Sequence, residues 1–182
     1  MAVTLRKILD TDLGNIIKWR MSPEVTKYMN TDPVLTLDGQ RKWIEVISAN
    51  PDVMYWVIEV DGEAAGVINY TGLTKDDGII GWAYYIGEQR LRSMKTALAL
   101  EMSMYDYAFK VLNKEAVISD VFTLNSGVIA LHKICGCEII EEKKNHVSKN
   151  GECFDVTFMQ MTKERWLQIC DSKKYEKISF GE

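Results

Sequence analysis

Apolar and polar positions repeat along this chain with two different periods, and the period changes several times between its ends. Alternating stretches rich in β-branched and aromatic residues predict strands at 3–9, 54–60, 64–70, 78–87, 116–122, 137–144 and 152–161. The pairs Asp61-Gly62 and Asn150-Gly151, which separate neighbouring strands, are typical of tight two-residue hairpin turns. The pattern therefore predicts two antiparallel hairpins within a larger sheet.

Segments with a helical period lie between these strands. Predicted helices begin after Thr11 or Asp12, at Ser22-Pro23-Glu24 and after Thr36, where residues that cap helix N-termini occur. Three more are predicted over 94–112, over 126–134 with Gly136 as the stop, and over 162–170. This order of elements predicts a mixed α/β (α+β) fold with one central sheet.

Composition limits the class of protein. The chain has 182 residues, 47% of them hydrophobic, and no repeat or linker divides it. We therefore expect one domain over 1–170 and a polar, loosely held tail over 171–182. The net charge of −4 argues against a nucleic-acid-binding face. No apolar run approaches the roughly 20 residues that span a bilayer, and no signal-peptide core opens the chain, so we expect no membrane partner and a cytoplasmic protein.

The four cysteines lie mainly in apolar phrases without a base beside them, which predicts reduced, unreactive thiols; they are Cys135, Cys137, Cys153 and Cys170. A single C-x-C pair and two histidines do not complete a zinc site, so we expect no metal. The same setting gives no support to a covalent acyl-enzyme.

The phrase NSGVIALHKICGC at 125–137 carries the most specific signal in the chain. Its residues occupy the positions of a phrase found in the GNAT acetyltransferases, a family that this chain resembles over almost its whole length. The resemblance implies a central, mostly antiparallel twisted sheet flanked by helices, and acetyl-CoA as co-substrate. It also implies that Asn125 and Lys133 contact CoA, and that His132, where the family usually has tyrosine, faces the thioester sulfur as the catalytic acid.

A second match covers 82–109, where the family has a strand, a pyrophosphate-binding loop and a long helix. Backbone amides at such a helix start form an anion site. The resemblance implies CoA binding by Tyr85, Ile86, Arg90, Arg92, Ser93, Met94, Lys95 and Thr96, with a backbone N–H near Tyr85 binding the catalytic oxyanion. Ser93 and Lys95 replace two small residues of the loop, so a binding module without turnover stays open as an alternative.

Residues 16–45 resemble the bacterial nucleotide-sugar N-acetyltransferases of the pseudaminic-acid pathway. This implies a UDP-linked amino sugar as acceptor, with Lys18 and Arg20 on its diphosphate and Trp19, Tyr28 or Trp43 stacking on a ring. Asn69 and Tyr84 are expected to line the acceptor cleft. The other interpretation places Trp19, Met29 and Trp43 in the core and leaves Lys18 and Arg20 on a solvated face.

Ribosomal-protein and polyamine acetyltransferases remain the alternative branch. Many of these have a glutamate where this chain has Ile79, which argues against a cationic acceptor, whereas the negative net charge would attract one. In either branch we expect direct attack of a primary amine on the thioester. Relatives that dimerise through edge strands make a homodimer an expectation as well.

Overall fold

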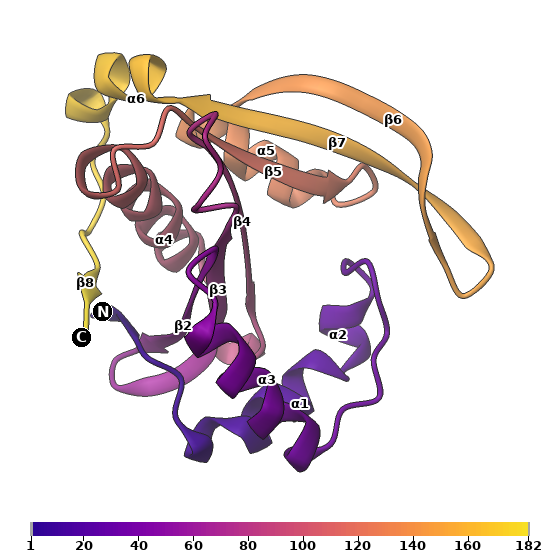
Figure 1. The fold of residues 1–182 in the computed structure, drawn as a ribbon. Helices are drawn as coiled ribbons and strands as arrows, with labels where there is room; N and C mark the ends of the chain where they lie inside the picture. Colours follow the sequence, from indigo (N-terminus) through magenta and orange to yellow (C-terminus); the bar gives the residue numbers. More distant parts are fainter. Residues whose placement is uncertain (1, 182) are drawn as a thin grey trace.

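The computed structural model describes residues 2–181 and joins their strands into one eight-stranded sheet of order β6-β7-β5-β4-β3-β2-β1-β8 (Figure 1). The strands are β1 (Val3–Arg6), β2 (Val53–Val60), β3 (Glu63–Thr71), β4 (Ile79–Ile86), β5 (Ala116–Phe122), β6 (Glu138–Lys149), β7 (Glu152–Thr162) and β8 (Ser179–Phe180). Neighbours are antiparallel except for the pairs β4/β5 and β1/β8. The mixed α/β fold and the mostly antiparallel sheet are confirmed.

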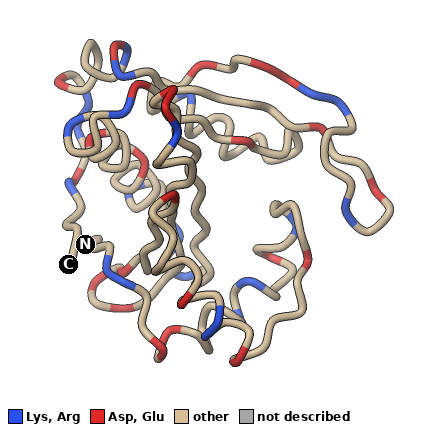
Figure 2. The backbone as a smooth tube through the Cα atoms, viewed as in Figure 1, with Lys and Arg blue, Asp and Glu red and all other residues tan. Residues whose placement is uncertain are grey.

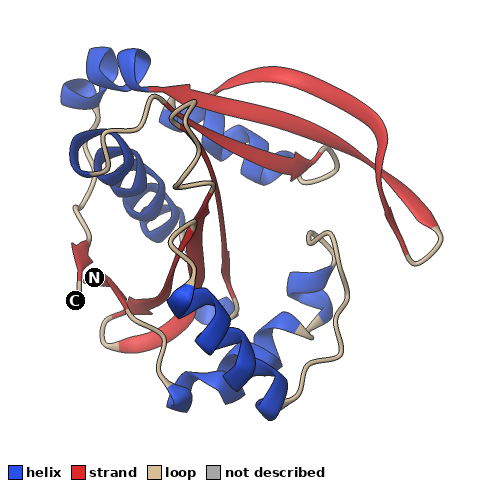
Figure 3. Ribbon diagram, in the orientation of Figure 1, coloured by secondary structure: helices blue, strands red, loops and turns tan. Residues whose placement is uncertain are grey.

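Helices pack against both faces of the sheet (Figure 3). They are α1 (Leu13–Arg20), α2 (Pro23–Thr26), α3 (Leu37–Ala49), α4 (Met94–Asp106), α5 (Ser126–Cys135) and α6 (Lys163–Ile169). Short 3-10 turns cover Asp10–Asp12, Gln89–Leu91 and Cys170–Ser172, and a π-helical turn, Tyr107–Val111, extends α4. The long helix predicted over 94–112 is thus present, but its last turn is wider than an α-helix. In that turn the ring of Tyr107 stacks on Phe180 at a centroid distance of 4.3 Å.

The predicted caps and turns explain where several elements begin and end. The hydroxyls of Thr36 and Ser93 accept hydrogen bonds from backbone N–H groups in the first turns of α3 and α4. Gly136 ends α5 with a φ of 110°, a left-handed conformation that glycine adopts without strain. Positive φ at both residues of Asp61-Gly62 and of Asn150-Gly151 gives the two predicted hairpins.

The sheet opens between β4 and β5. These parallel strands pair only at Ile79–Gly81 with Ala116–Ile118, and among the described residues no strand pairs with the facing edge of β4 beyond Gly81. Along 82–86 the backbone N–H and C=O groups that face β3 are paired, whereas those that face β5 are left for other partners. A cleft at this point follows from the divergence of the two strands.

Alternate residues of β4 enter two separate cores because successive side chains of a strand point to opposite faces. Trp82 and Ile86 belong to the larger core, which the sheet forms with α4, α5 and α6. Tyr85 packs against the smaller core, which α1 forms with β3 through Leu13, Ile16, Trp19 and Val67. The strand β4 thus separates two packed layers and is reached from both.

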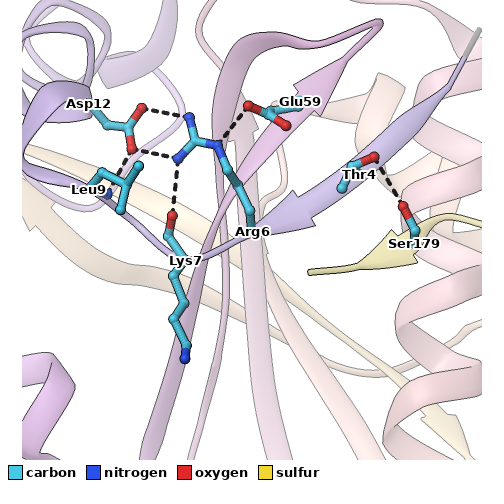
Figure 4. Close-up of polar contacts among 7 residues, drawn as sticks. All are labelled: Thr4, Arg6, Lys7, Leu9, Asp12, Glu59 and Ser179. Carbon is cyan, nitrogen blue, oxygen red and sulfur yellow. Dashed lines mark hydrogen bonds and ion pairs between the residues drawn. The ribbon is translucent and has the colours of Figure 1, made fainter. Parts of the chain in front are cut away.

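Polar contacts fix β1 to both of its neighbours (Figure 4). Arg6 donates to Glu59 at 2.6 Å and to both carboxylate oxygens of Asp12 at 2.7 and 2.8 Å. The hydroxyls of Thr4 and Ser179 lie 3.0 Å apart, between β1 and β8. Part of the tail predicted over 171–182 makes defined contacts with the rest of the chain, because Ser179 and Phe180 pair with β1. Two apolar residues of this polar segment, Ile178 and Phe180, pack against the larger core.

Candidate active site

Two cavities meet at β4. The larger has a volume of about 640 Å³ and lies in the gap between β4 and β5, and the smaller, of about 310 Å³, lies on the side of α1 and α3. Both are lined by Met29, Ala83, Tyr84 and Tyr85. Two reactants held in these cavities would therefore meet at the middle of β4.

The larger cavity runs to the start of α4. Arg92, Ser93 and Met94 line it there, and Asn125 and His132 line it from α5. The first amides of a helix lack intrahelical partners and carry the positive end of its dipole, which suits a phosphate group. The guanidinium of Arg92 is also held at this end, because it donates to the carbonyl of Ile86 at 2.8 Å.

Six of the ten predicted CoA-binding residues line this cavity: Tyr85, Ile86, Arg92, Ser93, Met94 and Asn125. The other four do not. Arg90 pairs with Glu63, and Lys95 pairs with Glu176 at 2.8 Å, so both cations are engaged in surface ion pairs. Thr96 is buried beneath the Ser93 cap, and Lys133 is exposed on α5. Lys95, which replaces a small residue of the predicted pyrophosphate loop, therefore does not add its charge to the lining of the cavity.

His132 lies at the end of a buried hydrogen-bond network. Its Nδ1 is 2.7 Å from Oε1 of Glu101, and the hydroxyl of Tyr105 donates to the same oxygen at 2.9 Å. The thiol of Cys137 lies 2.8 Å from that hydroxyl. His132 is 3% exposed and Glu101 is fully buried, with its second oxygen, Oε2, lacking a hydrogen-bond partner. Burial, with the nearby Glu101, raises the pKa of Cys137 to about 12.

One ligand atom each from Glu101, His132 and Cys137 lies within 4.8 Å of the others. These atoms are already joined through hydrogen bonds, directly or through Tyr105, and the buried thiol keeps its proton. We therefore assign the three residues to a hydrogen-bond network, and the absence of a metal stays a prediction.

The smaller cavity has aromatic walls and few polar groups. Arg20, Gln40 and Asn69 line it together with Trp43 and Tyr55, and none of its lining residues is acidic. The guanidinium of Arg20 donates to the carbonyl and the hydroxyl of Thr31 at 3.1 and 2.8 Å. Burial lowers the pKa of Arg20, although Tyr85 and Asp32 oppose this, and the side chain remains a cation at neutral pH.

Three of the predicted acceptor residues lie elsewhere. Trp19 is 2% exposed in the smaller core, where its Nε1 donates to Glu88 at 2.8 Å and its indole lies against Gly87. A stacking role for Trp19 does not fit this burial, and the core interpretation does. Lys18 is exposed and pairs with Glu88, while Tyr28 lines the larger cavity. Arg20, Asn69 and Tyr84 do line the smaller cavity.

The hairpin of β6 and β7 extends from the sheet toward the loop that follows α2 (Figure 1). Lys149 bridges the gap: its Nζ donates to the carbonyls of Thr26 and Met29 at 2.8 and 3.1 Å and lies 3.4 Å from Asp32. Because this loop contributes Met29 to both cavities, Lys149 holds one of their walls in place. We define these contacts as the Lys149 clasp.

Charge is spread over the whole chain rather than gathered in one region. Figure 2 shows Lys and Arg interspersed with Asp and Glu along the backbone. Within residues 2–181, no helix is long and apolar enough to cross a membrane. Neither finding points to a binding site other than the two cavities.

Comparison with known proteins agrees with this arrangement. Residues 2–138 match the model of the acetyltransferase (GNAT) domain, and a comparison with curated protein sequences found no match. Spermidine N-acetyltransferase from Vibrio cholerae, in complex with CoA and spermine, has a similar structure, with a TM-score of 0.84, 19% identity, and 91% and 98% of the two chains covered. Spermidine/spermine N-acetyltransferase from the same bacterium, with manganese ions, gives a TM-score of 0.76, 18% identity, and 92% and 96% coverage.

The chain belongs to the GNAT acetyltransferases. It is an N-acetyltransferase that uses acetyl-CoA, as the sequence resemblance implied. At 18–19% identity the two structural relatives support the fold and do not identify the amine.

Proposed function

We propose that this acetyltransferase acts on the primary amine of a UDP-linked amino sugar. The observation that carries the proposal is the smaller cavity, where Arg20 is the charged residue and no carboxylate lines the wall. A polycation buried there would lack anionic partners, whereas a neutral sugar with a diphosphate would find amides, aromatic rings and a guanidinium. Gln40, Asn69 and Trp43 supply the uncharged contacts.

Residues around the meeting point of the cavities have distinct roles in this proposal. Acetyl-CoA supplies the activated acetyl group from the larger cavity. The walls at Ala83–Tyr85 orient the amine so that its nitrogen lone pair attacks the carbonyl carbon. A backbone N–H on the unpaired edge of β4, near Tyr85–Ile86, donates to the oxygen on which negative charge develops. His132 gives a proton from Nε2 to the sulfur as the carbon–sulfur bond breaks. The amine releases its extra proton to solvent.

A polyamine is the second candidate acceptor. The structural similarity to spermidine N-acetyltransferase and the net charge of −4 favour it. The acid-free smaller cavity, and Ile79 in place of a glutamate, favour the amino sugar. A CoA-binding module without turnover is the remaining alternative, since Lys95 and Arg90 do not line the larger cavity.

Two measurements separate these candidates. The first is thermal unfolding with acetyl-CoA: at 100 times Kd a ligand adds about 2.7 kcal/mol, or a rise of roughly 5–10 °C for a chain of this size. The second is release of CoA thiol with a UDP-linked amino sugar, spermidine or an N-terminal peptide amine as acceptor. We expect the highest kcat/KM for the amino sugar. A higher value for spermidine would replace our proposal by the polyamine reaction, and binding without thiol release from any acceptor would indicate the module.

A further inference from the structure

Glu101 is a buried acid at a position where the helical pattern of α4 calls for an apolar residue. Its side chain is fully buried, and Oε2 has no hydrogen-bond partner. A carboxylate in such a place costs several kcal/mol unless a cation or a set of donors compensates it. The side chain that lies nearest to it as a potential cation is His132, through Nδ1 at 2.7 Å.

We propose that Glu101 is a positioning residue, which holds His132 with Nδ1–H on its carboxylate and Nε2 toward the larger cavity. This inference rests on the proposed role of His132 as the acid. His132 lines that cavity. Within residues 2–181 its imidazole makes one hydrogen bond, from Nδ1 to Glu101. Because a carboxylate oxygen only accepts, the proton of the pair is on Nδ1, and Nε2 is the nitrogen left for the reaction.

The directions of the other hydrogen bonds agree with this arrangement. Tyr105 uses its single proton on Glu101, so the thiol of Cys137 donates to the tyrosine oxygen in turn. The chain of donors thus runs from Cys137 through Tyr105 to Glu101, and His132 donates from the opposite side. Both donors point at one carboxylate oxygen, which fixes that oxygen relative to α5 and the imidazole.

The groups around the pair remain uncharged near neutral pH. Burial raises the pKa of Tyr84 on β4, of Tyr105 on α4 and of Cys135 on α5, and that of Cys137 to about 12. The ring of Trp82 covers the imidazole at a centroid distance of 5.7 Å. Lys173 and Arg165 lie near the two thiols and bond to backbone carbonyls instead of Glu101. Glu101 also helps to raise the pKa of these four groups, and His132 is the potential cation that lies within hydrogen-bond distance of its carboxylate.

The chemistry of the step follows from this geometry. The imidazolium gives its Nε2 proton to the sulfur, which takes the electron pair of the broken carbon–sulfur bond. The ring becomes neutral while Nδ1–H stays on Glu101, and a proton from solvent restores the imidazolium. Glu101 itself neither gains nor loses a proton and touches no substrate.

The test compares Glu101→Gln, His132→Gln and the double variant, with Glu142→Gln as the matched control, because it makes the same substitution at an exposed acid of β6 outside the network. We expect Glu101→Gln to lower kcat about 10–100-fold, with both KM values within twofold. The alkaline limb of kcat against pH should move to lower pH, since an amide stabilises the imidazolium less than a carboxylate does. In the His132→Gln background Glu101→Gln should change kcat less than twofold, and Glu142→Gln should keep wild-type kcat.

Two outcomes would overturn the assignment: wild-type kcat in Glu101→Gln, or the same loss from Glu101→Gln with and without His132. Wild-type kcat in His132→Gln would instead show that His132 is not the catalytic acid. Loss of acetyl-CoA binding in a variant would show that the substitution has disrupted the larger cavity. Should Glu101→Gln not fold, ¹⁵N NMR of histidine in the wild-type protein decides. Neutral His132 must show Nδ1 protonated, with exposed His146 as the internal reference; protonation of Nε2 instead would sink the proposal.

Discussion

Lys149→Met would show whether the Lys149 clasp holds the wall of the cavities in solution. Methionine keeps the aliphatic stem that lies against Phe122 and Phe154 but removes the ammonium that contacts two carbonyls and Asp32. The side chain is 9% exposed, so its bonds are better protected than those of a surface pair. Hydrogen bonds of a charged donor contribute about 1.5–3 kcal/mol each, and the carbonyls regain water when the loop opens. We therefore expect a net loss of about 2 kcal/mol.

This loss has two measurable forms. If the loop and hairpin unfold with the rest of the chain, Tm falls by about 4–8 °C. If the loop opens by itself, the acceptor KM rises about 10–30-fold, because each 1.4 kcal/mol corresponds to a factor of ten. Differential scanning fluorimetry and thiol release measure the two effects, with Lys144→Met as the control, an exposed lysine of the same strand without an ion pair in the described structure. Unchanged Tm and KM in Lys149→Met would refute the reasoning.

Three further predictions concern packing, pH and the acceptor. Gly87→Ala should cost about 1–3 kcal/mol in a urea unfolding curve, because its Cβ would overlap the indole of Trp19, whereas Gly14→Ala meets nothing and should not destabilise. Burial raises the pKa of Asp12, but hydrogen bonds from Arg6 and from the backbone of Leu9 lower it by more, so the net pKa is below its usual value. The ionised carboxylate therefore stabilises the fold at neutral pH, and this contribution is lost as pH falls below about 4. The free energy of unfolding of Asp12→Asn should differ from that of the wild type above this pH and approach it below. Arg20→Ala should raise the acceptor KM severalfold and leave the acetyl-CoA KM unchanged in initial-rate assays; an equal rise in both would remove Arg20 from acceptor binding.

Local sequence signals predicted most of the fold. Caps such as Thr36 and Ser93, and the Asp61-Gly62 and Asn150-Gly151 turns, act within a few residues, so they can be interpreted without knowledge of distant contacts. The tail could not be predicted in this way. The pairing of Ser179 with β1 depends on residues about 175 positions away, and a two-residue strand leaves no periodic pattern.

The candidate site was predicted less completely, for the same physical reason. From the sequence, the ring of Trp19 could pack either on a ligand or in the core. The structure shows it in the smaller core against Gly87, a contact that the sequence does not reveal. Glu101 did give a signal, an acid at an inward position of a helix, but its partner His132 lies 31 residues away. Lys149 gave none, because it follows a run of polar residues on an exposed hairpin.

The position of β4 between the two cavities has a consequence for the order of events in each turnover. In the proposed reaction the acetyl donor occupies the larger cavity and the acceptor the smaller one, so neither has to leave before the other arrives. We therefore expect the reaction to pass through a complex of the enzyme with both substrates. Reciprocal plots at several fixed acceptor concentrations then intersect instead of running parallel. In the mechanism that we propose, the protein brings two molecules together and carries no acetyl group of its own between them.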